Sequence, residues 1–338
     1  MRPLTPRRLL LICLGLAGVL LLTVLVSLKF GTRTISLADL TSMLFHTVVG
    51  QSDQVSSEYR LIVFDIRWPR ILLAMIVGAA LSVAGASFQA LLRNPLADPY
   101  VLGVSSGAAL GVMLSLIWAA RSPGAAPFAA FAGAAAASGA VYFLGRRGGY
   151  LDSFALLLGG IITASFLSAV IMFLMTIISG RDLRGMAFWL MGDLTTASPV
   201  SAVWLLLVLL MTIGAIYTTA ADLNLLMAGE QEALHLGVDV TRVKLVVYLG
   251  ASVLTGLAVA VSGAIGYVGL LVPHLIRMIF GSDYRLLIPA AAIGGAIVLV
   301  IADTLARTLV APIELPVGAM TAMVGAPMFI YLLRRRIE

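Results

Sequence analysis

Apolar and polar positions form long blocks along this chain instead of alternating at the short periods of a soluble fold. Apolar runs of about 20 residues recur from the first tens of residues to the C-terminus, and short segments rich in Arg, Asp, Pro and Gly separate them. A run of this length suits a helix that crosses a bilayer. Strands of a membrane barrel would instead alternate over about ten residues. The pattern predicts an all-α polytopic membrane protein, formed by one transmembrane domain over residues 1–338.

The runs predict ten transmembrane spans. They cover residues 9–28, 69–92, 101–119, 125–144, 154–178, 200–220, 245–261, 266–280, 286–305 and 317–333. The first run follows a basic N-terminus, as in a signal peptide, but it is too long for one and no small-residue cleavage site follows it. We therefore expect an uncleaved first span. An even number of spans places both termini on the same side of the membrane.

The polar segment 221–244 is the most distinctive connection between spans. It is acidic in its first half, and its apolar residues recur at helical spacing. Gly229 and Gly237 bracket a short stretch that we expect to be helical, with Gly237 suited to the C-terminal cap. Two interpretations stay open at this point. The segment is either a surface loop with one amphipathic turn or a docking helix for a soluble partner.

Composition and charge support the membrane assignment. Hydrophobic residues make up 61% of the chain and charged residues only 11%, too few to cover the surface of a soluble domain of this length. The excess of basic residues does not indicate nucleic-acid binding, because the arginines stand singly at the ends of apolar runs, where they set topology. With a cytoplasmic N-terminus, 13 of the 22 Lys and Arg residues fall inside, and so does segment 221–244. The nine on the outer side suggest that this face docks something acidic.

Few residues within the spans carry chemistry. Asp303 and Arg307 lie one helical turn apart and are placed to pair, with Glu314 just beyond. His274 follows a proline and fits a structural role better than a proton relay. No His, Cys, Asp and Glu set has metal-ligand spacing, and the single Cys13 fits a small core residue. We therefore predict no catalytic residues, no metal and no cofactor bound by this chain.

Two classes of membrane protein are disfavoured by these absences. An ion- or proton-coupled transporter usually needs a carboxylate or histidine near the membrane centre, and a membrane-embedded enzyme needs paired His or Asp motifs. The chain has no Gly-Lys phosphate-binding loop either. If transport uses ATP, the nucleotide and its Mg²⁺ must be bound by another chain.

Several motifs together resemble one family. They are ArgTrpProArgIleLeuLeu (67–73), the glycine- and alanine-rich stretch 78–111 with ArgAsnProLeuAlaAspPro inside it, AlaGlyGluGlnGluAlaLeuHisLeuGlyVal (228–238), and the segments 263–277, 302–307 and 314–327. From about Arg67 to the C-terminus the chain resembles the FecCD family, the permease subunits of type II ABC importers for iron-siderophores, haem and vitamin B12. The resemblance implies a homodimer with ten spans per subunit, two ABC ATPase subunits on the cytoplasmic side and a periplasmic substrate-binding protein above.

The resemblance also implies roles for particular residues. The cytoplasmic loop that contacts the ATPase corresponds to segment 221–244, through Gly229, Glu230, Ala233, Leu236 and Gly237. The arginines that meet the binding protein correspond to Arg67, Arg70 and Arg307, with Trp68 where leucine is more usual. The cytoplasmic gate corresponds to Asp152, Ser153 and Phe154 at the start of the fifth span.

The expected function is that of a permease in an ATP-driven importer that moves a metal chelate into the cytoplasm. Iron-siderophore is the first expectation for the substrate, with cobalamin and haem as alternatives, because selection rests mainly with the binding protein. The expected location is the bacterial inner membrane, with both termini cytoplasmic. ATP hydrolysis is expected on the separate ATPase subunit, so the chain itself is not an enzyme.

Overall fold

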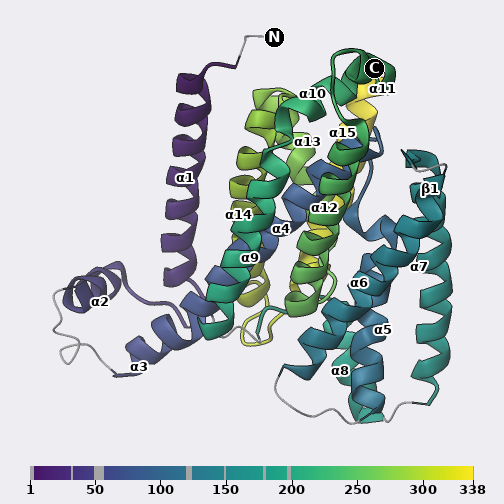
Figure 1. Cartoon of the computed structure of the whole chain (residues 1–338). Coiled ribbons are helices and arrows are strands. Elements are labelled where there is room, and N and C mark those ends of the chain that lie inside the picture. Colours follow the sequence, from purple (N-terminus) through teal and green to yellow (C-terminus); the bar gives the residue numbers. More distant parts are fainter. Residues whose placement is uncertain are drawn as a thin grey trace.

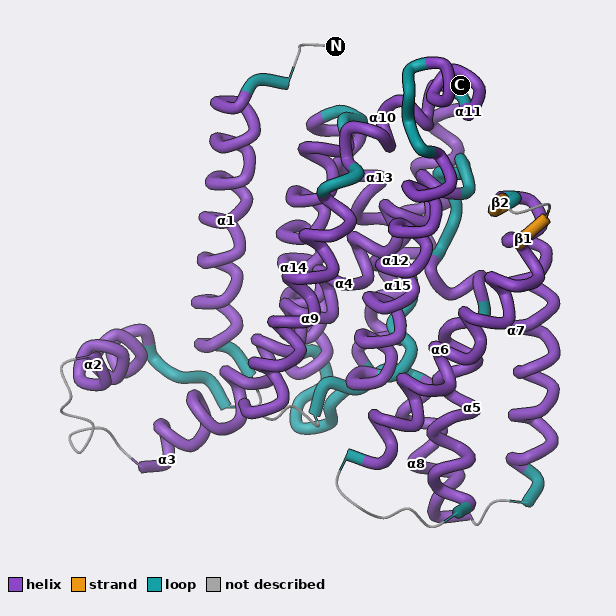
Figure 2. The backbone as a smooth tube through the Cα atoms, viewed as in Figure 1, coloured by secondary structure: helices purple, strands orange, loops and turns teal. Residues whose placement is uncertain are grey.

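The chain folds almost entirely into helices in a computed structural model that describes residues 4–31, 33–48, 57–118, 124–147, 150–177, 180–195 and 199–337 (Figure 2). The first half contains α1 (Pro6–Lys29), α2 (Leu37–Val48), α3 (Ser57–Arg60), the π-helix η2 (Leu61–Arg67), α4 (Trp68–Leu91), the 3₁₀ turn η3 (Pro99–Leu102), α5 (Val104–Ile117), α6 (Ala125–Gly145) and α7 (Ser153–Met175). The second half contains α8 (Gly180–Leu190), α9 (Pro199–Tyr217), α10 (Ala220–Ala228), α11 (Glu230–His235), α12 (Val240–Ser262), α13 (Val268–Phe280), α14 (Tyr284–Thr308) and α15 (Val317–Ile337). The described strands are β1 (Arg146–Arg147) and β2 (Tyr150–Leu151), an antiparallel hairpin before α7.

Helix α4 forms the centre of the bundle, with α12, α13 and α14 packed around it (Figure 1). Almost every residue of α4 is buried. This is expected of a helix that is apolar on all of its faces. Its partners reach it closely because small residues lie at the crossing points. A Cβ atom on Gly78 would collide with the carbonyl of Gly295 in α14, and one on Gly85 would collide with the carbonyl of Gly269 in α13. Such close approaches are the way in which membrane helices pack without a hydrophobic driving force.

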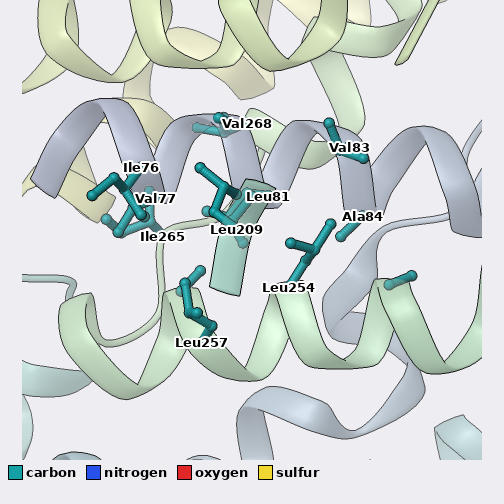
Figure 3. Close-up of a cluster of buried hydrophobic side chains, with 14 of the residues drawn as sticks. Ile76, Val77, Leu81, Val83, Ala84, Leu209, Leu254, Leu257, Ile265 and Val268 are labelled. Carbon is teal, nitrogen blue, oxygen red and sulfur yellow. The ribbon is translucent and has the colours of Figure 1, made fainter. Parts of the chain in front are cut away.

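The core around α4 is filled by aliphatic side chains of α4 itself and of the helices packed against it. Figure 3 shows Ile76, Val77 and Leu81 of α4 beside Leu209 of α9, with Leu254 and Leu257 of α12 facing them. All of these side chains are at most 5% exposed. Helices α5, α6 and α7 form a second group beside this core, and α1 stands on the opposite side against α14.

The two ends of the bundle differ. The start of α1, the end of α15, the short helix α11 and the β1–β2 hairpin lie at one end, here called the α11 end (Figure 1). Helices α2, α3 and α8 lie at the other, here called the α2 end. Both ends of the described chain are therefore on the same side of the bundle as segment 221–244, which is the arrangement that an even number of spans requires.

A helix lies at each of the ten expected spans. Within the described residues, six helices are long and apolar enough to cross a bilayer: α1, α4 with its extension, α6, α7, α12 and α14. Helices α9 and α10 make a seventh if they are one span bent by 49°. The helices α5, α13 and α15 are apolar but shorter. Residues 119 and 178, at the ends of two expected spans, lie outside the described residues.

Two expectations about the connections need correction. We expected the second span to begin at residue 69, whereas the helix that becomes α4 begins at Ser57 and passes through η2. The segment between the fifth and sixth spans contains α8, which we did not expect. Both helices lie at the α2 end and carry charged residues, so hydropathy gave no signal for them.

Candidate functional site

The short helix α11 forms an exposed corner between the α10 and α12 helices. It begins after Gly229 and ends at Gly237, whose φ of +85° places it in the left-handed region that favours glycine. The N–H of Gly237 donates to the carbonyl of Leu234, and the N–H of Val238 donates back to Ala233, which completes a Schellman-type end. The sequence therefore fixes both ends of a helix of only six residues.

The side chains of α11 divide into an inner and an outer set. Ala233 is fully buried against the bundle, whereas Leu234 and Leu236 are 58% and 67% exposed. An exposed pair of leucines on a helix with fixed ends is the geometry of a contact for another protein. Of the five residues expected to contact the ATPase, Leu236 is thus on the free surface, and Ala233 seats the helix.

Glu230, at the first position of α11, connects this helix to two other segments. Its Oε1 accepts a hydrogen bond from Nζ of Lys244 at 2.8 Å, and an Arg93 guanidinium nitrogen lies 3.1 Å from the same oxygen. Arg93 follows the end of α4, and Lys244 lies in the first turns of α12. The α11 helix is therefore held against the bundle by charge as well as by Ala233.

A second connection anchors α10, which leads into α11. The amide nitrogen of Asn224 donates to Asp283 at 2.8 Å, and its amide oxygen accepts from the N–H of Tyr284 at 2.9 Å. These contacts fasten α10 to the turn before α14. The Arg285 side chain and the Asn224 amide both donate to Asp283, and together they lower the pKa of this carboxyl to about 2.

The expected gate residues begin α7. Asp152 caps the helix, since its Oδ1 accepts the N–H of Ala155 at 2.6 Å. Ser153 donates through its hydroxyl to the carbonyl of Leu91 at 2.8 Å, which ties the start of α7 to the end of α4. Phe154 is 72% exposed. The three residues lie at the α11 end, in the same part of the bundle as the β1–β2 hairpin.

At the α2 end the three expected docking arginines are interior residues. Arg67, Arg70 and Arg307 are all less than 8% exposed. Nε of Arg70 donates to Asp303 at 2.8 Å, and another of its nitrogens donates to Glu314 at 2.6 Å. The expected pairing within α14 is confirmed, because Nε of Arg307 lies 3.0 Å from the second oxygen of Asp303.

The remaining contacts of these arginines join α1 to the network. Arg307 donates to the hydroxyl of Ser27 at 2.9 Å. Arg67 donates to the backbone carbonyls of Leu28 at 2.5 Å and Lys29 at 3.2 Å, and also to that of Arg33. The network thus fastens the end of α1 to α4 and α14. Sequence reasoning found the pair within one helix but did not predict that Arg70 pairs with Asp303, because 233 residues separate the two.

A small cavity of about 160 Å³ opens beside this network. Arg70, Asp193, Thr195 and Glu314 line it, together with apolar residues of the turn before α15. Glu314 is 37% exposed at its side chain, so one partner of Arg70 reaches the surface. Arg70 is therefore the docking candidate that an outside group approaches most directly.

Pro273 interrupts α13 and creates a polar site that the sequence did not indicate. A proline has no N–H, so the carbonyl of Gly269 loses its usual partner within the helix. Nε2 of the buried Gln89 lies 3.5 Å from that carbonyl and 3.3 Å from the carbonyl of Leu270. The oxygen of Gln89 accepts from Arg277, in the last turn of α13. The break is therefore satisfied by a side chain of α4, as membrane interiors require.

A larger apolar groove of about 1120 Å³ lies between α5, α6 and α7. It is lined mainly by glycine, alanine and aromatic residues, including Gly107, Gly111, Phe128 and Phe166. Among the described residues, no group of three or more His, Cys, Asp and Glu side chains is placed to hold a metal ion. Ser115 and Thr163 are the polar side chains among the residues that line the groove.

Comparison with known proteins decides the family. Residues 19–335 match the model of the FecCD transport family. The chain belongs to this family. It is 45% identical over 279 residues to the hemin transport system permease of Yersinia pestis, with 81% of this chain and 83% of that protein covered. It is 43% identical over 277 residues to the cobalamin import system permease of Halobacterium salinarum, covering 82% and 74% of the two chains.

A solved structure agrees with this assignment. The inward-facing conformation of a metal-chelate type ABC transporter superposes with a TM-score of 0.82 at 30% identity, over 96% of this chain and 99% of that one. The FecCD chain described here is therefore a multi-pass permease subunit of an ABC transporter. As a permease it carries the path and not the ATP-hydrolysing site.

Proposed function

We propose that the chain is one of two identical subunits that form the path of an importer for ferric siderophores in the bacterial inner membrane, with both termini cytoplasmic. Two ABC ATPase subunits bind at the α11 end, and a periplasmic binding protein docks at the α2 end. The observation that carries this proposal is α11, a rigidly ended helix with two exposed leucines at the end of the bundle that holds both termini.

Segment 221–244 is the coupling loop in this proposal. Gly229 and Gly237 end the helix, Glu230 and Ala233 fasten it to the bundle, and Leu236 contacts the ATPase. Because α10 and α11 are tied to α12 and α14, closure of the ATPases moves the helices and not only a loop. Asp152, Ser153 and Phe154 form the cytoplasmic gate, at the start of α7 on the same side.

Docking of the binding protein involves Arg67, Arg70 and Arg307 in different ways. Arg67 and Arg307 act from beneath the surface, because their partners are backbone carbonyls, Ser27 and Asp303. Arg70 makes the contact, because an acidic side chain of the partner can replace the partly exposed Glu314 on it.

The choice of an iron-siderophore rests on a permease for Fe(3+)-citrate import in Bacillus subtilis, to which this chain is 37% identical over 318 residues. Cobalamin and haem stay as alternative substrates, since permeases for both are more than 40% identical to this chain. A secondary transporter is less well supported. Asp303, the carboxylate buried deepest among the described residues with an ion pair, is paired with two arginines of the bundle.

The proposal is tested by uptake into proteoliposomes that contain this permease and its ATPase, with the binding protein outside. We expect ATP-dependent uptake of a ferric siderophore and none when the ATPase is omitted. Uptake of haem or cobalamin instead would overturn the substrate, and uptake driven by a proton gradient alone would overturn the class of transporter.

A further inference from the structure

One buried lysine joins the α11 helix to the start of α7. Nζ of Lys244 donates to Glu230 of α11 at 2.8 Å and to the carbonyl of Leu151 at 2.8 Å. Leu151 ends the β1–β2 hairpin, and Ser153 begins α7 two residues later. A single ammonium group therefore links the segment that meets the ATPase to the segment that carries the expected gate.

The surroundings of Lys244 make this link specific. The residue is only 4% exposed, although it lies close to the α11 end. Its carboxylate partner is shared with Arg93, and the Glu230 side chain is 39% exposed. Replacing a buried ion pair with apolar groups often leaves stability unchanged or improves it. Stability alone thus gives no strong reason for an ammonium at this position, whereas a link between moving parts does.

The start of α7 has few other fixed points on this side. Ser153 donates to the carbonyl of Leu91 in α4, and the N–H of Asp152 donates to Gly145 at the end of α6. Neither contact involves α11 or α12. Among the described contacts, the hydrogen bonds of Lys244 to Glu230 and Leu151 join α11 to the hairpin before α7. A displacement of α11 against the bundle reaches the hairpin through them.

We infer that Lys244 is a positioning residue that transmits the movement of α11 to the start of α7. The inference rests on the proposed function of α11 as the contact for the ATPase. When α11 moves, Glu230 draws the ammonium group with it, and Lys244 either pulls Leu151 or releases its carbonyl. In both cases the first turn of α7 responds to the state of the ATPase, which connects nucleotide binding to the cytoplasmic gate.

The test uses the whole importer in proteoliposomes and measures both ATP hydrolysis and substrate transported. Lys244→Met removes the donor and keeps the length of the side chain. We expect ATP hydrolysis to continue while the substrate transported per ATP falls about tenfold, within the range of typical coupling between sites. Lys244→Arg keeps the charge and restores part of the ratio. The matched control is Arg7→Met, an exposed basic residue at the start of α1 and outside segment 221–244, which leaves the ratio unchanged.

Spin labels test the relay, the link through Lys244, separately from the proposed function of α11, on which that link rests. In a Cys13→Ser background, one label replaces Gln231 on α11 and, in a second protein, Tyr150 beside Leu151; both side chains are exposed. Distances between the two subunits are measured with and without trapped nucleotide. We expect both pairs to change in the parent. In Lys244→Met only the Gln231 pair changes.

Each other outcome is informative. A Tyr150 pair that responds fully in Lys244→Met, or an unchanged transport ratio, overturns the relay. A Gln231 pair that does not respond in the parent overturns the proposed function of α11, and the relay with it. If Lys244→Met fails to assemble, Glu230→Gln keeps the bond to Leu151 and weakens the link to α11. The same loss of the Tyr150 response is expected, and a normal response contradicts the relay.

Discussion

Asp303 is the residue whose loss should most destabilise the α2 end. It is fully buried and is the shared anion of Arg70 and Arg307. Asp303→Asn keeps the shape of the side chain and removes its charge. Arg70 then retains only Glu314, which is partly exposed, and Arg307 retains the hydroxyl of Ser27. Two buried cations are left facing one another with a single carboxylate near them.

The magnitude follows from the burial of these groups. Removing one partner of a buried ion pair costs about 3–5 kcal/mol. Because Glu314 and Ser27 remain as partners, we expect the lower half of that range, about 3–4 kcal/mol. The free energy of unfolding is measured by denaturant titration in detergent micelles, followed by the fluorescence of the tryptophans. The control is Asp65→Asn, an exposed carboxylate of η2 near the same end, which should leave the unfolding curve unchanged.

A double-variant cycle sharpens this test. If Asp303 acts through Arg70, the loss caused by Asp303→Asn should be smaller in an Arg70→Met background, where one of the uncompensated cations is already gone. A loss of unfolding free energy below about 1 kcal/mol in the parent background would refute the reasoning. So small a loss is typical of surface substitutions and is not expected when a buried anion shared by two arginines is removed. Equal losses in both backgrounds would show that the two residues do not interact.

Two further predictions concern other parts of the bundle. Gly85→Ala should lower the yield of folded protein in detergent, because the new Cβ would meet the backbone carbonyl of Gly269; Gly139→Ala, with open space around it, should not, and equal yields would contradict the close α4–α13 crossing. Asp283 has its pKa lowered from 3.8 to about 2, mainly by Arg285, so its stabilising contribution is present above about pH 4 and is lost as the pH falls toward 2. Thermal unfolding measured across this window should show a weaker acid dependence in Asp283→Asn than in the parent, and identical slopes would argue against the assigned contact.

The apolar runs allowed the helices of the membrane domain to be predicted from the sequence. A run of about 20 apolar residues has few alternatives to a helix in a bilayer, so α1, α4, α7 and α14 lie where the runs predicted them. The short α11 helix was predictable for a different reason, since Gly229 and Gly237 mark its ends. Helix α8 was not, because its charged residues give no apolar signal.

The polar contacts between helices could not be predicted from one sequence. Asp303 and Arg307 were found because they share a helix and lie one turn apart. Arg70 and Lys244 belonged, from the sequence, to the set of charges that orient the spans. Their actual partners, Asp303 and Leu151, are far away in the chain and come close only through helix packing. Hydropathy and spacing carry no record of such contacts.

The burial of the docking arginines also could not be predicted. Positions at the ends of apolar runs usually face water, so we expected Arg67, Arg70 and Arg307 to be accessible. In the structure the helix that becomes α4 extends outward to Ser57, and the end of α1 covers Arg67. The charge pattern grouped these residues on one side of the membrane but did not show that they are structural as well.

The most direct test of the central claim is ATP-dependent uptake that relies on the contact between α11 and the ATPase. The importer is reconstituted with parent permease or with Leu236→Glu, which places a charge on the exposed face of α11 and leaves its ends intact. The account predicts that the variant is folded and inserted but binds the ATPase poorly and imports no ferric siderophore when ATP is supplied. Normal binding and normal ATP-driven uptake by the variant would contradict the assignment of α11 as the coupling helix.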